Sequence, residues 1–223
     1  MITTEVAADG ALAPELTASV LAAAVRAEDA SAAGGECVMV LRIGGAAPGS
    51  RFAWPGPVSV GDVNKWEGAL RRLEQVPAPV IALVDGDAYG PAAELLLVAD
   101  YRIMAAGTVF ELAASEGGVW PAMAVYRLAG QAGGGPAREL AVLGRALSAE
   151  RTRDCGLVDA VIEPGAEADS IAAGAMLFGA VSGIEIAIRR RLLLDAPSTR
   201  FEDALGAHLA ASDRALRRER AAS

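Results

Sequence analysis

One acidic residue lies alone in an apolar stretch near the centre of the chain. Glu94 stands between the turn-forming sequence GDAYG, which begins at Gly86, and the apolar run LLLVA, which ends at Ala99. A carboxyl group held in such a place can transfer protons as a general acid or base. It can equally be a structural carboxylate that pairs with an arginine or caps nearby backbone groups. This stretch alone leaves both interpretations open.

The other residue types that often carry catalysis are scarce. His208 is the only histidine and no G-x-S-x-G motif is present, so a Ser-His-Asp triad is not expected. We expect His208 on the surface of a C-terminal helix. Cys37 and Cys155 are far apart and lack the spacing of metal ligands, so we expect two packed thiols and no metal site.

The composition narrows the classes of function. The 223 residues suffice for one domain with a large core, and 53% of them are hydrophobic. The formal net charge of -8 argues against nucleic-acid binding, which requires a basic surface. No apolar run is long enough to span a bilayer, and no secretory signal is evident. We therefore expect a cytoplasmic protein that binds neither nucleic acid nor membrane.

Alternating strand and helix patterns predict an α/β layered fold that would position Glu94. Strands are expected at residues 37–45, 79–86 and 160–165, with two short strands around Gly107. Helices are expected at residues 12–27, 63–75, 92–98, 138–147 and 148–156, the last between an N-cap at Ser148 and Gly156, with two or three more after residue 165. Loops are expected at residues 46–62 and 133–137. Glu94 then lies in a short buried helix after a strand and a glycine turn.

A long segment around Glu94 resembles a known family. The sequence PVIALVDGDAYGPAAELLLVADYRIMAAGTVFEL, from Pro79, resembles the crotonase superfamily, which includes the enoyl-CoA hydratases and isomerases. Typical members read P-x-I-A-x-V-x-G-x-A-x-G-G-G-x-E-L-A-x-x-C-D, followed by a short strand pair and a phenylalanine. The residues on this pattern are Pro79, Ile81, Ala82, Val84, Gly86, Ala88, Gly90, Glu94, Leu95, Asp100 and Phe110. A second similar segment, YRLAGQAGGGPARELAVLGRALSAERTRDCGLVDAVI, extends the match, which covers residues 37–163.

The resemblance implies a fold, an assembly and a chemistry. The fold is a crotonase-like spiral of strand-strand-helix units over residues 1–165, followed by C-terminal helices over residues 166–223. These helices would form the interface of a homo-oligomer, a trimer or a hexamer. The usual ligand is an acyl-CoA thioester, which is a substrate, and no cofactor is implied. Two backbone N–H groups stabilise the enolate oxygen while one or two carboxylates move protons or orient water.

The resemblance also assigns site residues, one position at a time. Glu94 falls on the first catalytic glutamate. Trp54, in RFAWPGP, falls on the first oxyanion position, where its backbone N–H would be the donor. Pro91 falls on the second donor position, and proline has no N–H. The backbone N–H of Ala92 is the fallback donor.

Two further family features are missing from the sequence. Ala114 stands where the second glutamate is expected, and Glu116 is interpreted as a loop acid. No arginine or lysine precedes Arg26, although the family's N-terminal segment holds the adenine and phosphates of CoA. Whether CoA binds is therefore left open.

The altered site leaves three functions to compare. Small, divergent crotonases occur in actinobacterial pathways to dihydroxyphenylglycine, where they assist a type III polyketide synthase that condenses malonyl-CoA, and the sequence resembles the smallest accessory member of that set. One hypothesis is an enzyme that hydrates, dehydrates or isomerises a thioester, with Glu94 as acid/base. The second is a binding subunit that raises the output of such a synthase, and Pro91 with Ala114 favours it over the first. The third is a scaffold without a ligand.

Overall fold

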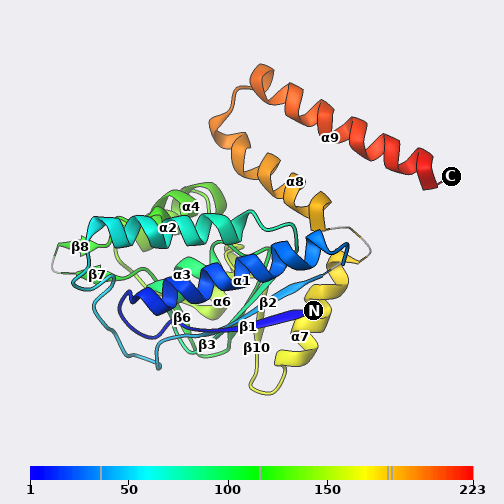
Figure 1. The fold of residues 1–223 in the computed structure, drawn as a ribbon. Coiled ribbons are helices and arrows are strands. Elements are labelled where there is room, and N and C mark those ends of the chain that lie inside the picture. The colour runs from blue at the N-terminus through cyan, green and yellow to red at the C-terminus, as the bar shows by residue number, and fades with distance from the viewer. Residues whose placement is uncertain (36, 116, 180, 182, 223) are drawn as a thin grey trace.

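A five-stranded parallel sheet forms the centre of the computed structural model, which describes residues 1–222 except 36, 116, 180 and 182. The strands in spatial order are β1 (Ile2–Ala7), β2 (Met39–Gly44), β3 (Val80–Asp85), β5 (Tyr101–Ala105) and β10 (Ala160–Ile162) (Figure 1). Every neighbouring pair in this sheet is parallel. Such a sheet needs cover on both faces, which explains the near-continuous apolar runs of β2 and β3.

Side chains alternate between the two faces of the sheet, as strand geometry requires. Leu41 and Val84 belong to the main core, on the face covered by the helices α1 (Pro14–Ala32), α2 (Val60–Glu74) and α3 (Pro91–Leu96). Leu83 belongs to a smaller cluster on the other face, against α7 (Glu167–Phe178). Glu94 and the outer face are therefore separated by the sheet.

Helices α1 and α2 run side by side over the first face (Figure 1). A capping box starts α2: the Ser59 side chain accepts from the Asp62 N–H, and the Asp62 side chain accepts from the Ser59 N–H. This motif satisfies two backbone donors that have no partner within the helix. It fixes where α2 begins, and so where Trp66 on its buried side meets α3.

Shorter elements surround α3. A three-stranded sheet contains β4 (Ala88–Tyr89), β6 (Val109–Glu111) and β9 (Leu147–Ser148), and a small antiparallel pair contains β7 (Ala114–Ser115) and β8 (Gly118–Val119). The helices α4 (Met123–Gln131), α5 (Gly134–Ala141) and α6 (Ala149–Asp154) complete this part. Of these elements, β4 contacts α3 directly and pairs with β6.

The C-terminal helices project from the body (Figure 1). They are α8 (Gly183–Asp195), a short 3-10 turn η1 (Ala196–Ser198) and α9 (Phe201–Ala222). Arg190 anchors α8: it donates to both Asp100 oxygens, at 2.7 and 2.6 Å, and to the carbonyls of Glu74, Val76 and Ala78.

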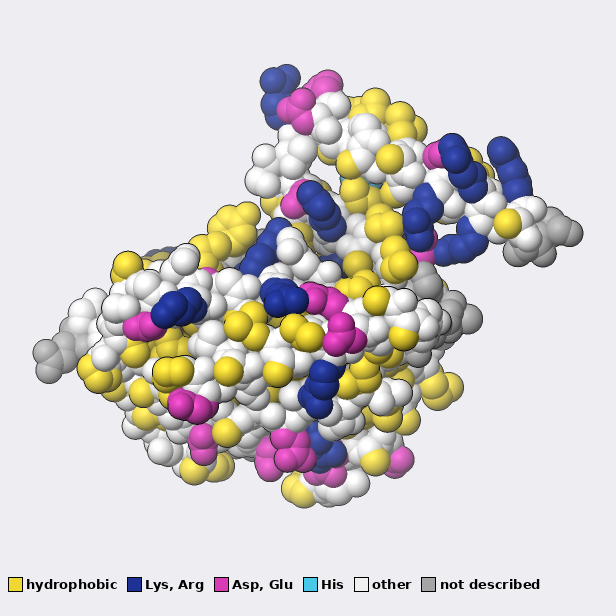
Figure 2. All heavy atoms as spheres, viewed as in Figure 1, with side chains coloured by type: hydrophobic (Ala, Val, Ile, Leu, Met, Phe, Trp, Pro, Cys, Tyr) yellow, Lys and Arg dark blue, Asp and Glu magenta, His cyan; other side chains and the backbone are white. Residues whose placement is uncertain are grey.

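The outer part of this arm carries arginines and exposed apolar side chains (Figure 2). Arg214 and Arg218 of α9 pair with Glu185 of α8, which folds α9 back along α8. Among the described residues no single helix is long and apolar enough to cross a membrane, although the bent pair of α7 with the 183–198 segment meets that test by length and composition alone.

Most predicted elements are confirmed, two predictions are wrong, and several elements, β1 among them, were not predicted. The segment before residue 12 forms β1, an edge strand in which exposed Thr3 and Glu5 alternate with buried Thr4 and Val6. Residues 133–137 were predicted as a loop, but α5 begins at Gly134 after Gly133, whose φ is 67°. The helix predicted over residues 138–147 stops at Ala141, and Leu147 already belongs to β9.

Candidate functional site

A glycine turn aims α3 at the loop between β2 and α2. Gly90 precedes the helix with φ 56° and ψ -117°, a conformation that essentially only glycine adopts. A side-chain carbon at this position would lie 3.3 Å from Cγ of Trp54, so the missing side chain also makes room for the indole. Pro91 is the first residue of α3, a position at which its lack of an N–H costs the helix nothing.

Two tryptophan side chains bind the carboxyl group of Glu94. The Trp54 indole Nε1 donates to Oε1 at 3.0 Å, and the Trp66 indole Nε1 donates to Oε2 at 2.6 Å. All three side chains are buried, and Glu94 is 3% exposed. The two indoles meet edge to face, with centroids 5.6 Å apart and planes at 78°. Each oxygen of the carboxyl group therefore has a donor, and the donors come from tryptophans rather than from an arginine.

Burial and hydrogen bonding act on the proton of Glu94 in opposite directions. Loss of water raises the pKa of Glu94, and the two indole donors lower it. Nearby Glu67 raises this pKa and Arg127 lowers it, and the result is a pKa of about 7. Desolvation is the largest of these effects because a buried carboxylate has lost its hydration. The group therefore titrates near neutral pH, in the range where acid/base catalysts work best.

Aromatic side chains fill the space around Glu94. The chain has 3 Trp, 3 Tyr and 4 Phe, and four of these ten gather here. Besides the two indoles, Phe52 and Tyr89 meet edge to face at 5.1 Å, and the Tyr89 hydroxyl donates to the Phe52 carbonyl. The Arg51 guanidinium lies 4.9 Å from the centre of the Tyr89 ring.

Ion pairs hold the loop that carries Trp54. Arg51 bonds to Asp87 at 3.0 Å and to Glu111 at 2.6 Å. Asp87 is buried and also accepts from the backbone N–H groups of Gly49 and Val109. The loop is therefore tied to the turn before α3 and to β6, and the indole lies against Gly90.

The residues assigned by resemblance occupy neighbouring positions, but with altered parts. The indole side chain of Trp54 reaches Glu94, while the donor role of its backbone N–H stays a prediction. Ala92 is the second residue of α3 and fully buried, and its N–H as fallback donor stays a prediction as well. Ala114 lies in β7 with an exposed side chain, so no carboxylate stands at that position. Glu116 lies outside the described residues.

Trp66 was not among the site residues predicted from the sequence. It lies on the apolar side of the predicted helix 63–75, where an aromatic residue is ordinary core. The usable signal was chemical: a buried indole N–H needs an acceptor, and a buried carboxylate needs donors. Glu94 and Trp66 are 28 residues apart, so only the fold pairs them.

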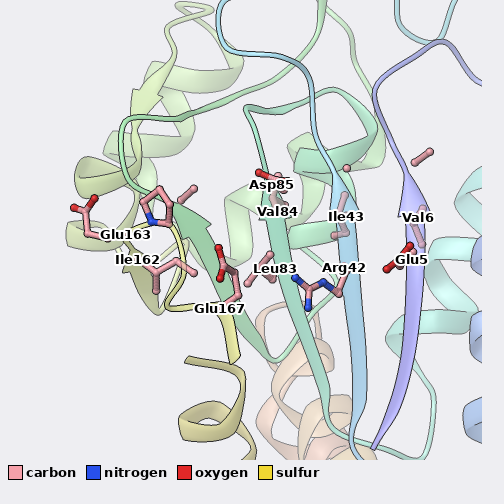
Figure 3. A pocket seen from close by; sticks show the side chains of 14 residues that line it. Glu5, Val6, Arg42, Ile43, Leu83, Val84, Asp85, Ile162, Glu163 and Glu167 are labelled. Atoms are coloured by element: carbon pink, nitrogen blue, oxygen red, sulfur yellow. The ribbon is translucent and has the colours of Figure 1, made fainter. Parts of the chain in front are cut away.

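A hollow of about 560 Å3 lies on the outer face of the large sheet, away from Glu94. Figure 3 shows Glu5, Arg42, Leu83, Asp85 and Glu167 around it, from β1, β2, β3 and the start of α7. Leu83 points to this side and its neighbour Val84 to the core, so the hollow is not an entrance to the Glu94 site. The described residues contain no group of three or more His, Cys, Asp or Glu that could hold a metal ion.

Comparison with known proteins assigns the chain to a family. A family model described as "Enoyl-CoA hydratase/isomerase" matches residues 63–176. An Amycolatopsis orientalis protein named "Enoyl-CoA-hydratase" is 43% identical over 213 residues, which cover 95% of this chain and 94% of that protein. The chain belongs to the enoyl-CoA hydratase/isomerase family. The expected crotonase fold is confirmed: an enoyl-CoA hydratase structure from Polaromonas sp. JS666 matches with a TM-score of 0.75 at 24% identity, over 96% of this chain and 88% of that one.

A more distant relative comes from the same organism as the first. The "(3,5-dihydroxyphenyl)acetyl-CoA 1,2-dioxygenase" of Amycolatopsis orientalis is 34% identical over 122 residues. The match covers 55% of this chain and 27% of that protein. In this chain each oxygen of Glu94 accepts an indole N–H, the side chain at Ala114 carries no carboxylate, and Pro91 has no backbone N–H.

Proposed function

We propose that this protein is a divergent crotonase of specialised metabolism that acts as a binding subunit and raises the output of a type III polyketide synthase using malonyl-CoA. The observation that carries the proposal is the state of Glu94, whose two oxygens are bound to Trp54 and Trp66 in a buried site. A general base must reach the proton that it abstracts, but this carboxyl group is 3% exposed and already accepts an indole N–H on each oxygen. Pro91 removes a second function of the site, because it has no N–H to offer an oxyanion.

The relatives support the metabolic setting. One of them is named for the oxidation of a (3,5-dihydroxyphenyl)acetyl-CoA and comes from Amycolatopsis orientalis. The accessory crotonase called DpgB, which the sequence resembles, belongs to the pathway to dihydroxyphenylglycine. The protein would work in the cytoplasm, where malonyl-CoA is used.

A homo-oligomer, a trimer or a hexamer, is part of the proposal. Helix α9 exposes Phe201, Leu205, Leu209 and Leu216, which are between 43% and 76% exposed. Their spacing of four or seven residues puts them along one side of the helix. A stripe of this kind is typical of a surface that another chain covers.

Reconstitution of the synthase reaction tests the proposal. A purified type III synthase from an actinobacterial dihydroxyphenylglycine pathway is supplied with malonyl-CoA, and product is measured with and without this protein. We expect stimulation by wild type and by Glu94→Gln alike, because the carboxylate takes no part in chemistry. A catalytically active hydratase of the same family, added at equal concentration, is the control and should not stimulate. Unchanged product with wild type would rule out the accessory role.

The second candidate function is an enoyl-CoA hydratase, dehydratase or isomerase with Glu94 as acid/base. The pKa of about 7 favours it, because a carboxyl group that titrates near neutral pH is suited to proton transfer. It requires the Trp54 loop to release Oε1 before the thioester enters. The backbone N–H groups of Trp54 and Ala92 would then be the oxyanion donors. Loss of thioester turnover in Glu94→Gln would be its signature.

A further inference from the structure

The space beside Glu94 is a slot for a flat ring, and the protein fills it with its own side chain. Gly90 forms its floor, the edge of Trp66 forms a wall, and the Glu94 carboxyl group lies at its end. The Trp54 indole occupies the slot and is 4% exposed. A molecule that fits this slot therefore needs a flat aromatic ring and one hydrogen-bond donor.

The occupant and the slot belong to different kinds of structure. Trp66 and Glu94 lie in the helices α2 and α3. Trp54 lies in the segment between Gly44 and Val60, which contains neither helix nor strand. Side-chain contacts from Arg51, Tyr89 and Asp87 hold this segment, together with the bond from Trp54 to Glu94. Irregular segments tend to open at lower free energy than helices, and binding in the slot requires this segment to open while α2 and α3 stay folded.

We propose that this slot is a binding site for a small phenol, whose ring replaces the Trp54 indole and whose hydroxyl group donates to Glu94. A phenol reproduces both features of the indole, the flat apolar ring and the single donor. Its O–H group makes a shorter and stronger bond to a carboxylate than a neutral pair would make. The affinity of the wild-type protein is lowered by the fraction of molecules in which Trp54 is out of the slot. The inference concerns binding alone, so it can fail or hold separately from stimulation of a synthase.

Calorimetric titration with phenol and toluene tests the proposal, because the two probes have similar size and only phenol has a donor. Above about pH 8, where the carboxyl group is ionised, we expect phenol to bind Trp54→Ala about ten- to a hundred-fold more tightly than toluene, the factor that one hydrogen bond to a charged group supplies. Phenol should also bind this variant at least about tenfold more tightly than wild type, where the indole must first leave. The matched control is Trp54→Ala with Glu94→Gln, in which the preference for phenol should shrink by about tenfold because the acceptor is neutral.

Two outcomes overturn the proposal in the folded Trp54→Ala variant: no binding of phenol, or equal binding of phenol and toluene. If that variant does not fold, tryptophan emission of the wild-type protein decides. Phenol, and not toluene, should then shift the emission to the red as Trp54 enters water, and Trp54→Phe should lose this shift. Emission of the wild type that phenol leaves unchanged overturns the proposal.

Discussion

The pKa of Glu94 should make the stability of the protein depend on pH. Burial raises this pKa and hydrogen bonding lowers it. Burial raises the pKa of this group from 4.5 to about 7, although two indoles donate to it. Between these two values the folded protein holds a proton that the unfolded chain has released. Stability contributed by the protonated group is then complete below the unfolded pKa and is lost as the pH rises through the folded pKa.

The size of the effect follows from the shift. The pKa of Glu94 changes from 4.5 to about 7, and each pKa unit corresponds to about 1.4 kcal/mol. Part of this change falls below about pH 5. Between about pH 5 and about pH 8 the free energy of unfolding should therefore decrease by about 2.5 kcal/mol. Glu94→Gln cannot titrate, so its stability should lack this part of the pH dependence. The amide has a constant penalty of its own, about 1–3 kcal/mol, because its N–H2 group faces an indole donor.

Urea unfolding of both proteins across this pH range measures the difference. The constant penalty and all other titrating groups cancel when the pH profiles are subtracted, which leaves the contribution of Glu94. We expect wild type to lose about 2.5 kcal/mol relative to Glu94→Gln from the acidic to the alkaline end. A difference that is flat, or that grows in favour of wild type as the pH rises, would show that the pKa of Glu94 is not raised in the folded protein. It would mean that the two indole bonds outweigh desolvation.

Three further predictions concern the parts that position the site. Gly90→Ala should lower the free energy of unfolding by about 1–3 kcal/mol because of its backbone conformation and the nearby indole, whereas Gly68→Ala, in the open interior of α2, should be neutral or stabilising in the same urea assay. Arg190→Met should lower the free energy of unfolding by about 3–5 kcal/mol, because Asp100 loses its buried partner. The control Arg191→Met, at a side chain that is 77% exposed, should change this free energy by less than about 0.5 kcal/mol. Leu209→Glu in α9 should convert the proposed homo-oligomer to smaller species in light scattering, and a wild-type monomer at micromolar concentration would contradict the proposed assembly.

The elements predicted correctly were those whose local signals and tertiary environment agree. Residues 37–45 and 79–86 are apolar runs bounded by glycine or proline, and they became the central strands β2 and β3. The predicted cap at Ser148 accepts from the Arg151 N–H, and Gly156 follows with φ 76°. The strand β1 was missed because an edge strand with one neighbour needs few apolar residues, and its alternation is short.

The candidate site was located from the sequence, but its state was not. Similarity to a family pattern identified Glu94, Pro91 and the Trp54 loop. That pattern concerns backbone donors, and it is silent on where the Trp54 side chain goes. The second bond to Glu94 comes from Trp66 on α2. Two strands, β3 and β4, separate this helix from α3 in the chain. Contacts of this kind are set by how α2 and α3 pack, which no local spacing in the sequence records.

Hydration of crotonyl-CoA tests most directly whether Glu94 is a structural carboxylate held by two indoles. Purified wild type and Glu94→Gln are compared at equal concentration, with an active hydratase of the family as positive control. We expect wild type to stay at the background rate and Glu94→Gln to be indistinguishable from it. Hydration by wild type at a rate normal for the family, reduced about 100-fold or more in Glu94→Gln, would contradict the account and establish Glu94 as a working acid/base.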